Sequence, residues 1–88
     1  MAKRVAVIAI IIENEQSVEQ VNAILHEYSD HIIGRMGIPY RQKGINIISI
    51  AIDAEQNDIN TIAGKIGKLD GVTAKTVYSP QKENKKLI

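Results

Sequence analysis

Two stretches of the chain, Val5-Ala-Val-Ile-Ala-Ile-Ile-Ile12 and Ile45-Asn-Ile-Ile-Ser-Ile-Ala-Ile52, decide the fold. Successive side chains of a β-strand point to opposite faces, so a strand with one face in water alternates apolar and polar residues. These two stretches barely alternate, which predicts central strands of a sheet that is covered on both faces. The 88 residues leave room for two helices, enough to cover one face. We therefore expect a second copy of the chain to cover the other face.

The residues between the strands predict two helices. Apolar residues recur at helical spacing over residues 18–28 and again over residues 59–66. Ser17 precedes the first helix and Gln20 follows three residues later, a spacing that predicts a capping box. Residues 53–57 are polar apart from Ala54 and predict a loop before the second helix.

Two further strands complete the predicted fold. One is expected over residues 31–38, closed by Pro39, and its Gly34 and Gly37 indicate a bulge or a close backbone approach, both usual at a sheet edge. The other is expected over residues 72–78. The order βαββαβ predicts an α+β, ferredoxin-like sandwich with an antiparallel sheet of order 4-1-3-2 and both helices on one face. This order places the two apolar strands in the centre, in agreement with their own pattern.

The composition limits the classes of function. The chain has no Cys, which excludes disulfides and thiolate metal sites and suits a reducing cytoplasm. Its net charge is +1 and it has three Tyr, no Phe and no Trp, which is a poor match to a phosphate backbone or to bases. The first apolar run is too short to span a bilayer. We expect one domain over residues 1–78 and a flexible basic tail over residues 79–88, in a cytoplasmic protein without a direct nucleic-acid or membrane partner.

No motif of catalysis is found in the sequence. A Ser/His/Asp set, a P-loop and a dinucleotide fingerprint are all missing, so we expect no catalytic residues and no enzyme. The two histidines, His26 and His31, are five residues apart across a predicted helix end, which is not the spacing of a helical metal site. We predict no metal ligands within one chain, and leave open a site shared across an oligomer that uses one histidine with Glu27 or Asp30.

A polar loop and two arginines form the candidate ligand site. The loop precedes the first helix, whose first backbone N–H groups lack partners beyond a cap. The two guanidinium groups are suited to a carboxylate or a phosphate. The predicted ligand-binding residues are Glu13, Asn14, Ser17, Arg35, Tyr40 and Arg41. The alternative is that these residues only solubilise the edge of an oligomer.

Several segments resemble a known family, the small iron-only hydrogenase system regulators. They are Ile33-Gly-Arg-Met-Gly-Ile-Pro-Tyr-Arg41, Gly44-Ile-Asn-Ile-Ile-Ser-Ile50, Ala63-Gly-Lys-Ile-Gly-Lys-Leu-Asp-Gly-Val72 and Lys75-Thr-Val77. The resemblance extends over about residues 3–78. It implies a ferredoxin-like domain akin to ACT domains and to the metal-binding half of nickel-responsive regulators.

The resemblance also implies a regulatory function. We expect a small-molecule- or metal-sensing module of an iron-only hydrogenase system, acting as a homo-oligomer (dimer or tetramer) without its own DNA-binding domain. Its partner would be a hydrogenase-system or regulatory protein. The alternative is an interaction or assembly partner in metalloenzyme maturation with no ligand of its own. The loop over residues 13–17 lacks the Gly usual in amino-acid-binding ACT domains, and the chain lacks the Cys of the nickel site, so neither ligand set is carried over.

Overall fold

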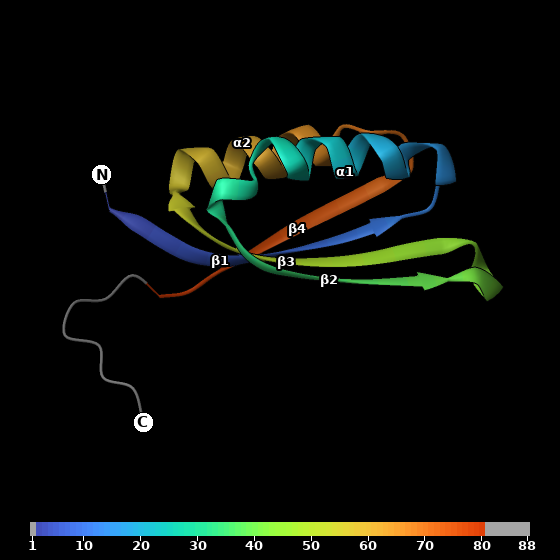
Figure 1. The fold of residues 1–88 in the computed structure, drawn as a ribbon, viewed down its shortest axis with the longest axis horizontal. Helices are drawn as coiled ribbons and strands as arrows, with labels where there is room; N and C mark the ends of the chain where they lie inside the picture. The colour runs from blue at the N-terminus through green and yellow to red at the C-terminus, as the bar shows by residue number, and fades with distance from the viewer. Residues whose placement is uncertain (1, 81–88) are drawn as a thin grey trace, which may run out of the picture.

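The computed structural model describes residues 2–80 as one four-stranded antiparallel sheet with two helices on one face (Figure 1). The sheet order is β2-β3-β1-β4, which confirms the predicted ferredoxin-like fold. The elements in chain order are β1 (Lys3–Ile12), α1 (Val18–Glu27), β2 (Ile32–Tyr40), β3 (Ile45–Glu55), α2 (Gln56–Gly67) and β4 (Val72–Tyr78). Of the predicted tail over residues 79–88, residues 81–88 lie outside the described part.

The core lies between the sheet and the helices. On β1, every second residue from Ala6 to Ile12 points to the helices and is at most 2% exposed. The buried residues of β3 pair beside them, as Ile8 does with Ile50. Each helix contributes one apolar stripe, as its spacing predicts. The stripes are Val21 and Leu25 of α1 and Ile59, Ile62 and Ile66 of α2.

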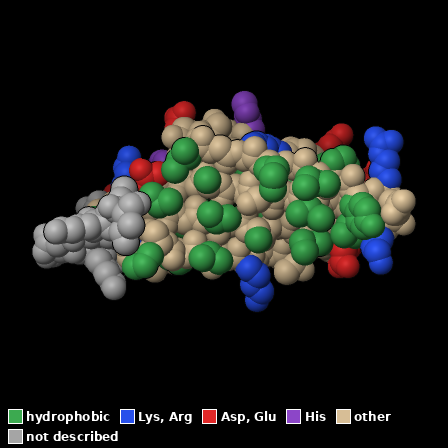
Figure 2. Space-filling model, turned by 90° about the horizontal axis from the view of Figure 1, so that it is seen from below, with side chains coloured by type: hydrophobic (Ala, Val, Ile, Leu, Met, Phe, Trp, Pro, Cys, Tyr) green, Lys and Arg blue, Asp and Glu red, His purple; other side chains and the backbone are tan. Residues whose placement is uncertain are grey.

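The opposite side of the sheet carries no helix in the described part of the chain (Figure 1). We call this surface the open face. Hydrophobic side chains gather along it over most of its length (Figure 2). By the strand register it consists of Val5, Val7, Ala9 and Ile11 of β1, Gly34, Met36, Ile38 and Tyr40 of β2, Ile45, Ile47, Ser49, Ala51 and Asp53 of β3, and Thr73, Lys75 and Val77 of β4.

Several predicted boundaries are wrong by a few residues. β2 continues through Pro39, which pairs with Asn46. A proline is tolerated there because β2 is an edge strand, whose outer N–H groups need no partner in the sheet. β3 extends through Glu55 and α2 begins at Gln56, so the predicted loop over residues 53–57 is strand and helix instead. The predicted bulge is confirmed between Ile32 and Gly34.

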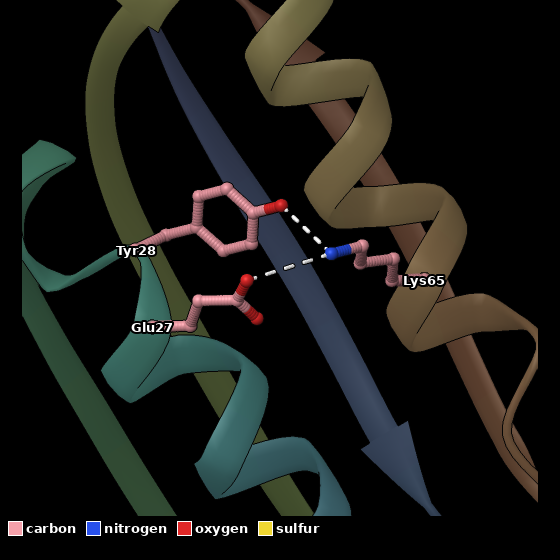
Figure 3. Close-up of polar contacts among 3 residues, drawn as sticks. All are labelled: Glu27, Tyr28 and Lys65. Carbon is pink, nitrogen blue, oxygen red and sulfur yellow. Dashed lines mark hydrogen bonds and ion pairs between the residues drawn. The ribbon is translucent and has the colours of Figure 1, made fainter.

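One polar cluster links the two helices on their solvent side (Figure 3). The Lys65 Nζ donates a hydrogen bond to the Tyr28 hydroxyl at 2.9 Å and lies 3.7 Å from Glu27 Oε2. The hydrogen bond to Tyr28, and then the nearby Glu27 charge, raise the pKa of Lys65 above its usual 10.5. All three side chains reach solvent, so packing of the apolar stripes dominates the contact between helices and sheet. Neither helix within residues 2–80 is long and apolar enough to cross a membrane.

Candidate functional site

A groove opens on the helix side of the sheet, between the N-terminal end of α1 and the hairpin that joins β2 to β3. The β2 residues that point to the helices there are Gly37 and Pro39, which pair with Ile48 and Asn46. A Cβ added to Gly37 would have no atom within 4 Å. Because these side chains are too small to reach α1, space remains between the helix and the edge strand.

Three adjoining hollows make up this α1–hairpin groove, with volumes of about 580, 450 and 240 Å³. Asn46 of β3 lines all three of them. Glu15 lines the two larger hollows, and Val18 lines the first and the third. Each of the two larger hollows is of the size that small molecules occupy in proteins, about 300–1,000 Å³.

Charges of opposite sign line the two walls of the groove. Glu15 and Glu19 belong to the turn and helix on one wall, and Arg41 belongs to the hairpin on the other. Arg35 reaches across the third hollow, where its Nη2 donates to Asn22 Oδ1 of α1 at 2.9 Å. Glu15, Glu19 and Arg41 form no ion pair with any other residue of the described range 2–80. Their charges are therefore available to a bound molecule.

The structure brings two of the predicted ligand-binding residues, Arg35 and Arg41, into the groove. Ser17 has a different role. It is only 2% exposed, and its hydroxyl donates to the Asp70 carbonyl oxygen at 2.6 Å. The predicted capping box is therefore wrong, since Ser17 makes no side-chain cap and adopts αR geometry. Its hydroxyl instead links the start of α1 to the turn before β4 through this hydrogen bond.

Glu13 and Asn14 also form hydrogen bonds to the turn before β4. The Glu13 N–H donates to the Gly71 carbonyl oxygen at 2.7 Å, and Asn14 Nδ2 donates to Asp70 Oδ2 at 3.2 Å. The Asn14 Oδ1 accepts the Gln16 N–H at 3.0 Å, which caps the short turn before α1. These hydrogen bonds join loop and turn, and neither Glu13 nor Asn14 lines the groove.

Tyr40 lies on the other side of the sheet. It pairs with Ile45 at an open-face position, and its hydroxyl donates to Gln42 Oε1 at 3.3 Å. The structure thus separates Tyr40 from Arg35 and Arg41.

Glu15, Glu19 and Asn46 line the groove but are not among the six predicted ligand-binding residues. Asn46 could have been recognised from the sequence, because a polar amide within an otherwise apolar strand is unusual and suggests a functional role. Glu15 belonged to the candidate loop but was not chosen over Glu13. Among residues 2–80, no three His, Cys, Asp or Glu side chains come together in a way that could hold a metal ion.

Comparison with known proteins identifies the family. Residues 4–76 match the TM1266-like family model, described as "Iron-only hydrogenase system regulator, putative". The chain belongs to this family. The match confirms the resemblance seen in the sequence.

A solved member of similar structure supports the fold. The structure of an uncharacterized protein, TM1266 from Thermotoga maritima, has a TM-score of 0.83 and 34% sequence identity to this chain. The match covers 86% of this chain and 96% of that one. No curated protein matches the chain. TM1266-like proteins are thus linked to this chain by fold and sequence, and the family's description names a regulator.

Proposed function

We propose that this chain is a regulatory module of an iron-only hydrogenase system that binds a small molecule in the α1–hairpin groove and acts as a homo-oligomer. The observation that carries the proposal is the pair of oppositely charged walls, with Glu15 and Arg41 lining the same hollow of about 450 Å³. The family's description as a regulator supports binding in place of catalysis.

The walls indicate the chemistry of the ligand. Arg35 and Arg41 present guanidinium groups, which bind carboxylates and phosphates through paired hydrogen bonds. Glu15 and Glu19 suit an amine on the same molecule, or a metal ion that accompanies it. A small polar molecule with an acidic group therefore fits the groove best, and divalent metal ions belong in the same screen.

The regulatory signal would pass to another protein of the hydrogenase system. The net charge of +1 gives the chain little attraction for a nucleic-acid backbone, so contact with a protein is the better supported route. We place this function in the cytoplasm, in keeping with the absence of Cys from the sequence.

A thermal-shift screen of amino acids, nucleotides, inorganic phosphate and divalent metal ions tests the proposal. A ligand of the native state stabilises it by RT ln(1 + [L]/Kd), which is about 2.7 kcal/mol at a hundred times Kd. Arg41→Ala is expected to lose the shift, whereas Lys43→Ala removes the same charge from the same hairpin and is expected to keep it. Gly37→Val places a branched side chain in the groove, at a position where an added Cβ meets no atom within 4 Å, and is expected to lose the shift as well.

Two results would contradict ligand sensing. One is that no compound stabilises the wild-type protein. The other is that Arg41→Ala and Gly37→Val bind as the wild type does. The alternative function, an assembly partner without a ligand, would then be favoured if a hydrogenase-system protein copurifies with the chain.

A further inference from the structure

The exposed large hydrophobic side chains of residues 2–80 are concentrated on one surface. Three lie on β1 (Val5, Val7 and Ile11), and three lie at open-face positions of β2 (Met36, Ile38 and Tyr40). Val77 of β4 is 68% exposed on the same face. The remaining one, Ile33, sits in the β2 bulge. The described surfaces of the two helices have none.

This amount of exposed apolar surface is large for a monomer. Each of the seven open-face side chains exposes between 39% and 68% of its surface. The partly buried Ile45, Ile47 and Ala51 of β3 lie between them and join them into one patch. The largest apolar patch on a typical monomer is about 300–600 Å² and is often functional. Seven large side chains on one face, each at least 39% exposed, form a patch on the order of that size, and an interface of standard size buries roughly 800 Å² on each partner.

We propose that a second copy of the chain covers the open face, with the two sheets packed against each other. The inference rests on the homo-oligomer of the proposed function and adds the surface that forms it. The result is four layers, with helices outside and two sheets inside. It supplies the second covered face that the doubly apolar strands require.

The charges of the open face favour a copy of itself over a charged partner. Lys75 lies on the edge strand β4, and Asp53 lies toward one end of β3. Lys3 and Glu55 lie opposite each other in the strand register, beyond Asp53. The signs balance and the charges lie at the margin, so two identical faces do not repel each other. An apolar centre with a polar rim is the usual anatomy of a protein interface.

The shape of the open face also suits sheet-on-sheet packing. Its middle contains the small residues Ala9, Ser49 and Ala51, and larger side chains lie beside them, with Val7 opposite Ala51 and Met36 opposite Ser49. Small central residues let two sheets approach to the usual spacing of about 10 Å. Two copies necessarily have the same twist, and sheets of equal twist nest when they cross at about −30°.

The α1–hairpin groove lies on the helix side of the sheet, so an open-face dimer leaves it accessible. The dimer and the ligand site can therefore be tested separately. Light scattering or sedimentation equilibrium at micromolar concentration measures the mass of the full chain. We expect a mass near twice the 9.7 kDa of one chain, or a larger assembly built from such dimers.

A matched pair of substitutions tests which surface associates. Ala9→Glu places a carboxylate at the centre of the open face, and Ala23→Glu places the same group on the exposed surface of α1. We expect Ala9→Glu to raise the dissociation constant by at least about 100-fold, because each copy would bury a bulky carboxylate in place of a methyl group. The opposite Lys75 would lose its solvation together with that carboxylate, a cost that a buried ion pair need not recover. Ala23→Glu should keep the wild-type mass. Circular dichroism checks that both variants are folded.

If Ala9→Glu fails to fold, Val77→Glu gives the same test at a more exposed position on the edge strand. An oligomer that the open-face variant splits, and that Ala23→Glu leaves intact, supports the inference. An oligomer that both variants leave intact, or that only Ala23→Glu splits, overturns it and leaves the proposed homo-oligomer standing. A monomeric wild-type chain overturns both and leaves the open face to a different protein, while ligand binding in the groove is unaffected.

Discussion

Along β1 the two faces of the sheet carry the same kinds of aliphatic residue but meet different surroundings. Ile10 and Ile11 are neighbours on β1, yet Ile10 is fully buried under the helices and Ile11 is 42% exposed on the open face. The difference comes from the position of the helices and not from side-chain chemistry. A strand that is apolar on both sides therefore predicts that both faces of the sheet are covered. It does not predict whether the same chain or another one covers each face.

The largest expected difference between the faces is in their contribution to the stability of a single chain. In the monomeric Ala9→Glu background, Ile10→Ala should lower the free energy of unfolding by about 2–5 kcal/mol, because it leaves a cavity in the core. Ile11→Ala should lower it by less than about 1 kcal/mol, because that side chain already meets solvent. Urea unfolding of the two variants measures both values. Equal losses would contradict the assignment of the two faces.

The attachment of α1 to the covered face gives the next effect in size. Ser17→Ala removes a partly buried hydrogen bond to the Asp70 carbonyl group and should cost about 1–3 kcal/mol in urea unfolding. Gln20→Ala is the control, since Gln20 is exposed and has no part in a capping box. Its cost should stay below about 0.5 kcal/mol. A larger loss for Gln20→Ala than for Ser17→Ala would restore the capping box.

A smaller effect, an increase in stability, is expected on the solvent side of α2. Gly64 of α2 has no atom within 4 Å of an added Cβ, so Gly64→Ala should stabilise the chain by about 0.5–1 kcal/mol through helix propensity. Gly71→Ala should destabilise it. Gly71 has a φ of +70°, and its added Cβ would lie 2.7 Å from the Asn14 Cβ. Thermal unfolding of the two variants checks the signs, and a loss of stability in Gly64→Ala would show that α2 meets a neighbour at this point.

The smallest effect is expected at the polar cluster between the helices. The folded-state pKa of Lys65 is raised, so its contribution to stability is complete below the ordinary pKa of 10.5 and is lost as pH rises through the folded-state pKa. Wild type and Lys65→Met should therefore differ by the same small amount between pH 7 and pH 9, and the difference should shrink above about pH 10.5. Urea unfolding at several pH values measures this. A difference that grows at alkaline pH would contradict the shift.

Much of the fold could be predicted because its signals are local. The order of elements, the central position of β1 and β3, and the bulge in β2 follow from periodicity and from the glycines. The boundary errors at Pro39 and at the start of α2 have one cause. Polar residues and proline occur at strand ends and in first helical turns as well as in loops. Pairing with neighbouring strands determines which of these structures forms.

The candidate site was predicted only in part, and the reason is the sequence distance between partners. Arg35 and Arg41 reach the groove because both flank the same hairpin, which the sequence shows. Asn14 and Ser17 form hydrogen bonds to Asp70, which follows Ser17 by 53 residues. Their structural role therefore could not be seen in the local sequence pattern. Tyr40 was separated from the arginines by strand pairing, since a shift of one residue moves a side chain to the other face.

The amino-acid sequence by itself determined that two strands are apolar on both sides, that two helices are available, and that a polar loop precedes the first. Only the tertiary structure decided that the even-numbered residues of β1 meet the helices and that Val5, Val7, Ala9 and Ile11 do not. The physical reason is that both sets of side chains gain similar free energy from burial, about 25 cal/mol per Å². Hydrophobicity therefore cannot choose between the faces. The direction in which the chain leaves each strand, together with the pairing of the four strands, determines which face the helices cover.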